Sequence, residues 1–214
     1  MLLARVQGHP ARAHLHGPLV EALGIPAEVC LHSSTPPNPW EGYKACLRDI
    51  PDCSHLLVIQ DDARPALNFA AALEQIAKRN PSTPVVLFLA KLPRRISVLA
   101  LRAAKNREAY VGTGMRQSEF CPVVAILWPR KKAEEFLTWA EENPRRLGHP
   151  SPRSDDGVLG RWAAFTHQLI RFSVPSIVQH DDREDSLIGR QAMWGKDSGR
   201  TALLFTEDAS VVSW

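Results

Sequence analysis

Short apolar runs, separated by stretches with helical periodicity, recur along this chain of 214 residues. The runs are too short for helices and contain few polar residues, which is typical of strands in a sheet covered on both faces. They predict strands at residues 2–6, 27–32, 56–59, 84–89, 123–128 and 171–180.

Apolar residues at helical spacing occupy the stretches between these strands. Leu15, Leu19 and Leu23 form one such face, and Gly24 ends the pattern as a C-terminal cap. Further helices are expected at residues 40–49, 69–80, 97–105 and 131–142 and from residue 155 onward. The alternation of strands and helices predicts an α/β fold with a mostly parallel central sheet flanked by helices.

Two adjacent acids, Asp61 and Asp62, follow the apolar strand at residues 56–59, and Pro65 ends that strand. Open α/β sheets bind their ligands at the carboxyl ends of strands. Neighbouring carboxylates repel each other, which favours a divalent cation as the compensating charge. In the alternative interpretation, the two acids are solvated turn residues that cap the helix near Asn68.

A second acidic pair, Asp155 and Asp156, opens a predicted helix after Ser154. As structure, Ser154 is an N-cap and the carboxylates stabilise the positive end of the helix dipole. As function, one carboxylate is a general base or anchors an acceptor hydroxyl, held on a rigid helix start.

The late strand at residues 171–180 ends in His180, just as the earlier strand ends in acids. A neutral imidazole is a good ligand for manganese and a poorer one for magnesium. Asp181 and Asp182, which follow, are alternatively turn residues.

The segment at residues 91–117 is rich in arginine and lysine, and Gly112-Thr-Gly114 within it predicts a turn. It is either a binding loop or a solvated basic surface. Arg190 and Lys196 lie in a later tail that could fold over an anionic ligand.

Composition narrows the class of protein. A hydrophobic content of 44% and a charged content of 23% are typical of a soluble globular domain, and a net charge of +3 is too small to indicate a nucleic-acid partner. The apolar start is too short for a signal peptide and no run reaches transmembrane length, so we expect a cytoplasmic protein. The cysteines lack CxxC spacing and are expected to be free thiols: Cys30, Cys46, Cys53 and Cys121.

The order of these motifs resembles that of small nucleotide-sugar glycosyltransferases of the GT-A fold, a Rossmann-type sandwich. Gln60-Asp61-Asp62 stands in the place of the family's DXD metal motif. Asp155-Asp156 with Gly160 is similar to the acidic motif that opens a helix beside the acceptor. The stretch ending in His180 is similar to the late strand whose histidine supplies another metal contact. The resemblance spans residues 2–189.

The resemblance implies a hexosyltransferase that moves a sugar from a UDP- or GDP-linked donor to a hydroxyl of a glycan, a protein or a small molecule. Asp61, Asp62 and His180 would bind Mn²⁺ or Mg²⁺, which stabilises the diphosphate leaving group. Asp156 or Asp155 would remove the proton of the acceptor hydroxyl. The nucleotide-sugar contacts it implies are Val6, Arg12, Asn38, Gly42, Gln60, Asp61, Arg190 and Lys196.

The sequence also departs from the family pattern. Gln60 replaces the first acid of a strict DXD motif, so the site is expected to bind its cation less tightly. We expect a catalytic domain at residues 1–189 and a tail at residues 190–214 that packs on or over the site. The sequence leaves open the donor nucleotide and sugar, the acceptor, the stereochemical outcome and the oligomeric state.

Two other functions fit parts of the pattern. A nucleotidyltransferase would use a similar sheet and paired acids, but needs a glycine-rich phosphate loop early in the chain, and Gly8-His-Pro-Ala-Arg12 contains one glycine. A non-catalytic GT-A-like binding or assembly module would keep the fold and need none of the acids. Metal-dependent binding of a nucleoside diphosphate separates this module from both enzymes.

Overall fold

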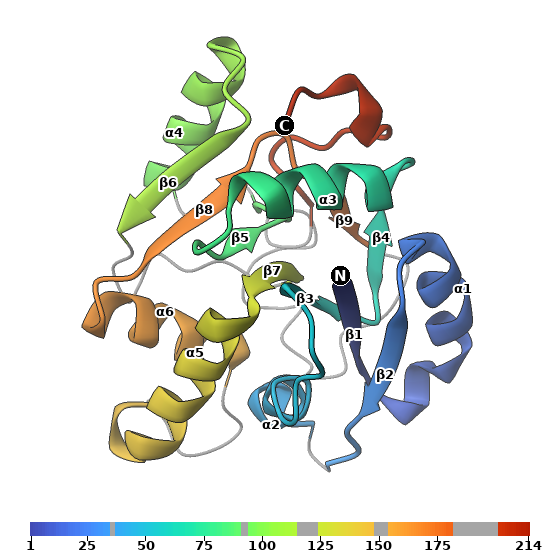
Figure 1. Ribbon diagram of the computed structural model, residues 1–214, viewed down its shortest axis with the longest axis vertical. Helices are drawn as coiled ribbons and strands as arrows, with labels where there is room; N and C mark the ends of the chain where they lie inside the picture. The colour runs from blue at the N-terminus through green and yellow to red at the C-terminus, as the bar shows by residue number, and fades with distance from the viewer. Residues whose placement is uncertain (35–36, 91–93, 115–123, 148–153, 182–200) are drawn as a thin grey trace.

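The computed structural model describes residues 1–34, 37–90, 94–114, 124–147, 154–181 and 201–214. In this part of the chain a seven-stranded sheet has the order β2-β1-β3-β7-β5-β8-β6 (Figure 1). β7 and β6 run opposite to the other strands, so the sheet is mostly parallel, as predicted. Its strands are β1 (Leu2–Gly8), β2 (Ala27–Leu31), β3 (His55–Gln60), β5 (Val85–Val86), β6 (Tyr110–Gly114), β7 (Ala125–Pro129) and β8 (Leu169–Ser173).

A small antiparallel sheet joins β4 (Ala63–Pro65) to β9 (Val178–His180). It pairs Ala63 with His180. This pairing brings the end of the late strand beside the acids that follow β3.

The helices match the predicted order along the chain. They are α1 (Ala13–Leu23), α2 (Pro39–Ala45), α3 (Phe69–Arg79), α4 (Arg94–Lys105), α5 (Arg130–Glu142) and α6 (Asp155–Phe165), with short 3-10 turns η1 (Pro10–Arg12), η3 (Pro144–Arg146) and η4 (Ala209–Val211). Gly24 caps α1 with φ 63°, a left-handed conformation that favours glycine.

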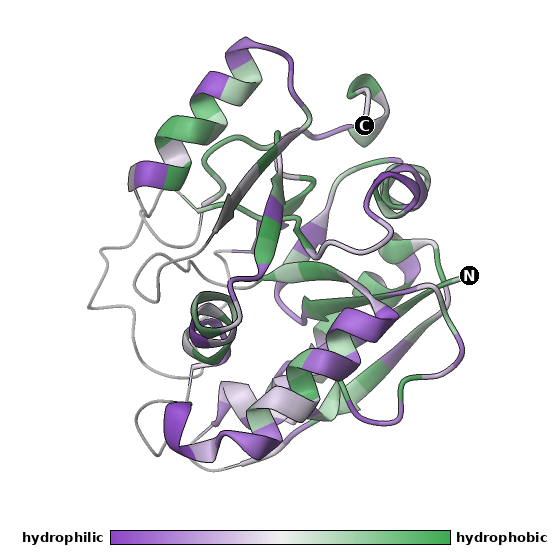
Figure 2. Cartoon of the chain, turned by 60° about the vertical axis from the view of Figure 1, so that its left-hand side comes forward, coloured by the Kyte–Doolittle hydropathy of each residue, from purple (hydrophilic) through white to green (hydrophobic). Residues whose placement is uncertain are grey.

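The two faces of the sheet carry different helices, because alternate side chains of a strand point to opposite sides. On β1, Arg5 and Gln7 reach the segment of α2, where they hydrogen bond to Cys46 O and Pro39 O. On the other face, a Cβ at Gly8 would lie 2.9 Å from the ring of His16 on α1. α1 and α2 therefore cover opposite faces of the sheet. Figure 2 shows the strands largely hydrophobic and the helices more hydrophilic on their outer sides.

An aromatic cluster forms the core beneath α2, α5 and α6. Trp128 of β7 stacks on Phe136 at a centroid distance of 5.3 Å, and Trp162 of α6 lies 5.2 Å from Phe136. These rings are buried. They fix α6, and with it the second acidic pair, against the sheet.

Four local predictions differ from the structure. The strand expected at residues 84–89 is a regular strand only over Val85–Val86, and the helix expected at 40–49 ends at Ala45. The turn expected at Gly112-Thr-Gly114 is wrong, because these residues pair with β8 as part of strand β6. The strand expected at residues 171–180 is two strands, β8 and β9, in separate sheets. A propensity pattern does not reveal pairing with a distant segment.

The described part of the tail lies along α3 and β4. Its residues form bridges to Leu67, Ala90 and Ser176, and Trp214 is fully buried. Glu207 pairs with Arg64 of β4, close to Asp62 in the sequence. The tail thus packs beside the element that leaves the acidic pair.

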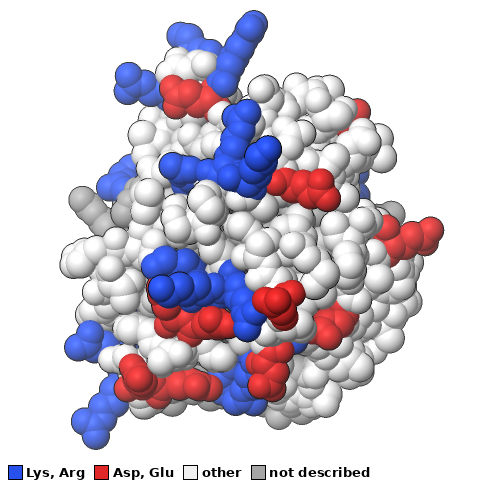
Figure 3. All heavy atoms as spheres, viewed as in Figure 1, with Lys and Arg blue, Asp and Glu red and all other residues white. Residues whose placement is uncertain are grey.

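Basic and acidic side chains are interspersed on the face shown in Figure 3, with lysine and arginine gathered at its upper end, the end where α4 lies in Figure 1. The described cations there include Arg102, Lys105 and Arg107, all exposed. Among the described helices, we find none with the length and apolar character needed to cross a membrane.

Candidate functional site

Asp61 and Asp62 lie where β3 ends, and both are 5% exposed. They do not cap the next helix. The N-cap residue of α3 is Asn68, which has a left-handed backbone conformation and makes no side-chain capping hydrogen bond. Their burial excludes the interpretation as a solvated turn. Buried carboxylates need compensating partners, and these come from the loop after β1 and from β9.

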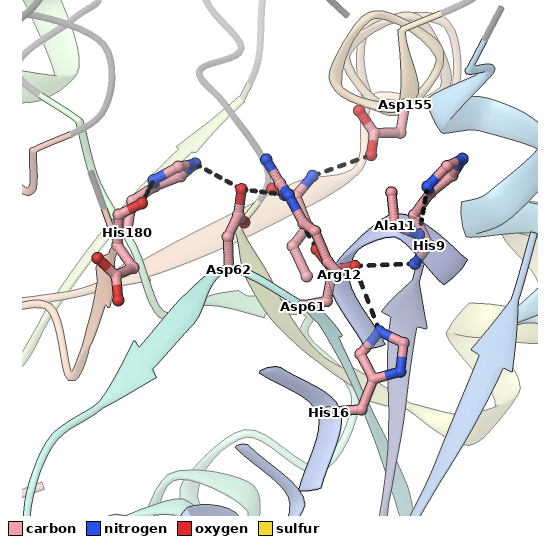
Figure 4. A network of polar contacts seen from close by, with 10 residues as sticks. His9, Ala11, Arg12, His16, Asp61, Asp62, Asp155 and His180 are labelled. Carbon is pink, nitrogen blue, oxygen red and sulfur yellow. Dashed lines mark hydrogen bonds and ion pairs between the residues drawn. The ribbon is translucent and has the colours of Figure 1, made fainter. Parts of the chain in front are cut away.

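The carboxylate of Asp61 is held by the segment that follows β1. Its Oδ2 accepts the backbone N–H of His9 at 2.8 Å and lies 3.5 Å from His16 Nε2. Its Oδ1 accepts a hydrogen bond from Arg12 Nη1 at 3.0 Å. Asp61 therefore ties the β1 loop and α1 to the end of β3 (Figure 4).

The carboxylate of Asp62 faces two basic groups with the same oxygen. Its Oδ2 lies 2.5 Å from Arg12 Nη1 and 3.3 Å from His180 Nε2. In Figure 4 Arg12 and His180 approach Asp62 from opposite sides. Arg12 Nη1 thus bridges the two predicted metal ligands, a contact that the sequence did not predict.

The ring of His180 has a defined orientation. Its Nδ1 lies 3.1 Å from the carbonyl oxygen of Asp181, and this contact is a hydrogen bond in the tautomer that carries its proton on Nδ1. In that neutral tautomer Nε2 presents a lone pair toward Asp62 Oδ2, whereas a proton on Nε2 makes the same contact a hydrogen bond to the carboxylate. Metal-binding histidines commonly donate their other ring N–H to a carbonyl in this way.

Arg12 is 7% exposed although it is charged. Burial opposes its charge, but the attraction of Asp62 and Asp61 outweighs this, and the pKa of Arg12 is raised above its ordinary value. The guanidinium is therefore a permanent positive charge between the carboxylates.

The second acidic pair also lies in this region, at the start of α6. Ser154 caps the helix by accepting the N–H of Gly157 at 3.1 Å, as predicted. Asp155 is buried, and its Oδ2 accepts a hydrogen bond from Gln60 Nε2 at 3.3 Å. Burial raises the pKa of Asp155, while hydrogen bonds from the Asp156 N–H, Gln60 and Gln7 partly offset this effect. Asp156 is half-buried.

Besides Arg12, Gln60 and Asp61, the predicted nucleotide contacts separate into three groups. Val6 is fully buried within β1, so its side chain does not line the site. Asn38 is the N-cap residue of α2, and Gly42 lies within α2, where an added Cβ would lie 3.2 Å from Gln7 Nε2. Arg190 and Lys196 lie outside the described residues.

Gln7, His9 and His16 belong to this region and were not singled out from the sequence. Gln7 is a polar residue near the end of a strand, and His16 is a buried polar residue on a helix. Either feature could have marked them, because buried polar groups need partners.

The predicted metal ligands do not form a complete protein cage. Within the described ranges, no group of three or more His, Cys, Asp or Glu side chains is arranged to hold a metal ion. Asp62 and His180 are a pair, and Asp61 is directed mainly at His9, His16 and Arg12.

No protein-family model matches the sequence, and a search of curated proteins finds no match. A similar solved structure is that of the inositol-1-phosphate CTP transferase from T. maritima, with 8% sequence identity and a TM-score of 0.41. The alignment covers 80% of this chain and 65% of that chain. We draw no functional conclusion from a similarity of this size.

Proposed function

We propose that the chain is a metal-dependent glycosyltransferase that moves a sugar from a nucleoside-diphosphate sugar to an acceptor hydroxyl. The observation that carries this proposal is the pair formed by Asp62 Oδ2 and His180 Nε2, 3.3 Å apart at the carboxyl end of β3. With Nδ1 directed at a carbonyl, this pair is suited to share a divalent cation.

Asp62 and His180 would hold Mn²⁺ or Mg²⁺ together with oxygens of the substrate. Such ions are commonly bound through one or two protein ligands and completed by phosphate oxygens, so two protein ligands are sufficient. The imidazole favours Mn²⁺. When bound, the cation stabilises the negative charge that develops on the diphosphate as the glycosidic bond breaks.

Asp61 has a different role from Asp62. Its oxygens accept hydrogen bonds from the His9 N–H and from Arg12 Nη1, and His16 lies beside it, so Asp61 holds the β1 loop in place. We therefore assign metal binding to Asp62 and His180 and loop positioning to Asp61.

The two residues of the second acidic pair also have different roles. Asp155 is buried and accepts hydrogen bonds from Gln60 and from the Asp156 N–H, which makes it a positioning residue. Asp156 is half-buried at the rigid start of α6 and is our candidate for the general base that accepts the proton of the acceptor hydroxyl.

The loop after β1 favours sugar transfer over nucleotidyl transfer. A triphosphate cradle needs free backbone N–H groups on a glycine-rich loop. Here the His9 N–H donates to Asp61, and Ala11 N–H donates to the His9 ring at 3.2 Å. Two of the loop's backbone donors are therefore already engaged.

Calorimetric titration tests the proposal. The protein is titrated with UDP, GDP and CMP and with their sugar conjugates, with and without Mn²⁺, and Asp62→Asn and His180→Ala are compared with wild type. Asp52→Asn is the matched control, since Asp52 is exposed and pairs with Arg130 away from the site.

We expect one nucleoside diphosphate to bind only with Mn²⁺, and this binding to be lost in Asp62→Asn and kept in Asp52→Asn. Release of the nucleoside diphosphate from its sugar conjugate on addition of an acceptor would establish transfer. Pyrophosphate release from a nucleoside triphosphate would instead identify a nucleotidyltransferase. If no nucleotide binds under either condition, the chain is a binding or assembly module.

A further inference from the structure

We propose that Arg12 is a resident counter-ion of the site, which a divalent cation displaces from Asp62 and which then contacts the diphosphate of the donor. This inference rests on the proposed function, because it concerns the same cation and the same nucleotide. It assigns to Arg12 the coupling between metal binding and nucleotide binding.

The first step is the sharing of one oxygen. Asp62 Oδ2 receives Arg12 Nη1 at 2.5 Å and faces His180 Nε2 at 3.3 Å. A cation bound by Asp62 and His180 would use this oxygen and would lie next to the guanidinium. Like charges at such a separation repel strongly in a buried site, so both cannot keep their positions.

The second step is the balance of charge. The two carboxylates carry two negative charges, and Arg12 neutralises one of them. Adding a divalent cation while Arg12 stays makes the group positive, with the histidines counted as neutral. A diphosphate reverses this excess, so Arg12 disfavours the cation alone and favours the cation together with a diphosphate.

The third step is that Arg12 has a second anchoring contact, with Asp61. Its Nη1 also donates to Asp61 Oδ1 at 3.0 Å, and Asp61 is held independently by the His9 N–H. Arg12 can therefore leave Asp62 while Asp61 still anchors it. Arg12 lies in η1, outside the sheet, so the displacement concerns its side chain and not a strand.

The test compares wild type with Arg12→Met, which keeps the length of the side chain and removes its charge, and with Arg12→Lys, which keeps the charge. Mn²⁺ binding is measured by electron paramagnetic resonance of the free ion, with and without UDP or GDP. The double variant Arg12→Met/Asp62→Asn is the control for the site of binding. Circular dichroism establishes that each variant is folded.

We expect Arg12→Met to bind Mn²⁺ alone about tenfold more tightly than wild type, and the double variant to lose this gain. In wild type the nucleotide should tighten Mn²⁺ binding by about tenfold, and in Arg12→Met this coupling should fall to about one. Arg12→Lys should behave as wild type or lie between the two.

A folded Arg12→Met that binds Mn²⁺ no more tightly than wild type would overturn the inference. If the repulsion between the two carboxylates prevents Arg12→Met from folding, the double variant Arg12→Met/Asp61→Asn removes one of these charges. Its Mn²⁺ binding is then compared with that of Asp61→Asn. Failure of the proposed function looks different: wild type then binds no nucleotide, while Arg12→Met still gains a Mn²⁺ site that depends on Asp62.

Discussion

Gln60 Nε2 donates a hydrogen bond to Asp155 Oδ2 at 3.3 Å and so joins the end of β3 to the start of α6. The two residues are distant in sequence, and Asp155 is buried. An acid in place of Gln60 would face Asp155 with a like charge. The glutamine instead supplies a donor.

Gln60→Met should therefore destabilise the protein. It keeps the length of the side chain and removes one donor from a buried carboxylate, which costs about 1–3 kcal/mol of unfolding free energy. Urea denaturation at pH 7 measures the loss. Gln168→Met is the control, since the side-chain amide of Gln168 donates an exposed hydrogen bond to the adjacent carbonyl of Leu169, and it should change stability by less than about 0.5 kcal/mol. Equal losses in the two variants would contradict the role of Gln60.

The hydroxyl of Tyr43 accepts the indole N–H of Trp128 at 2.8 Å inside the aromatic core. Tyr43→Phe leaves that N–H buried without its partner, so we expect a loss of about 1–3 kcal/mol in unfolding free energy. Chemical denaturation followed by tryptophan fluorescence measures it. A loss below about 0.5 kcal/mol would mean that Trp128 finds another acceptor.

The local elements could be predicted because their signals lie within a few residues. The apolar run before Asp61 predicts β3, Gly24 marks the end of α1, and Ser154 marks the start of α6. Each of these signals lies in or next to the element that it predicts. The α/β class followed from the order of such elements.

The pairing of distant segments could not be predicted. Tyr110–Gly114 forms an edge strand because it pairs with β8, and no turn residue in its own sequence reveals that partner. β9 leaves the main sheet to pair with β4, which places His180 opposite Ala63. The end of an apolar run marked His180 in the sequence, but its place 3.3 Å from Asp62 Oδ2 depends on the pairing of β9 with β4.

The role of Arg12 shows the same limit within the site. The resemblance implied Arg12 as a nucleotide contact and Asp61, Asp62 and His180 as ligands of a metal. The structure places the guanidinium itself against both carboxylates. A charge from a distant loop can compensate an acidic pair as well as a metal can, and only the fold brings that loop to the acids.

Cys30 should be the most reactive of the described thiols. A hydrogen bond with Cys46 lowers the pKa of Cys30, and Arg5 adds to this effect against the opposing effect of burial. Burial raises the pKa of Cys53. Cys30, Cys46 and Cys53 are all free, as predicted, and Cys121 lies outside the described residues.

Alkylation with iodoacetamide at pH 7.5, followed by peptide mass spectrometry, should therefore modify Cys30 before Cys53, because the thiolate is the reactive form. Arg5→Lys keeps the charge near Cys30 and should preserve this order. Faster labelling of Cys53 would contradict the assignment.

Asp155 should make the stability of the protein depend on pH in an unusual direction. Burial raises the pKa of Asp155 in the folded state, so the folded protein binds its proton more tightly than the unfolded chain does. The contribution of Asp155 to stability is then complete below its unfolded pKa and is lost as pH rises through the folded pKa. The loss is about 1.4 kcal/mol for each unit by which the pKa is raised.

We therefore expect the unfolding free energy of wild type, relative to Asp155→Asn, to fall in urea titrations as the pH rises from below the unfolded pKa of Asp155 through its raised folded pKa. Asp208 supplies a control of opposite sign, because hydrogen bonds from Asn68 and Ser210 lower its pKa in the folded state. Relative to Asp208→Asn, wild type should gain stability over its range of titration as the pH rises. If the two differences ran in the same direction, the raised pKa of Asp155 would be wrong, and with it the assignment of a buried, positioning carboxylate at the start of α6.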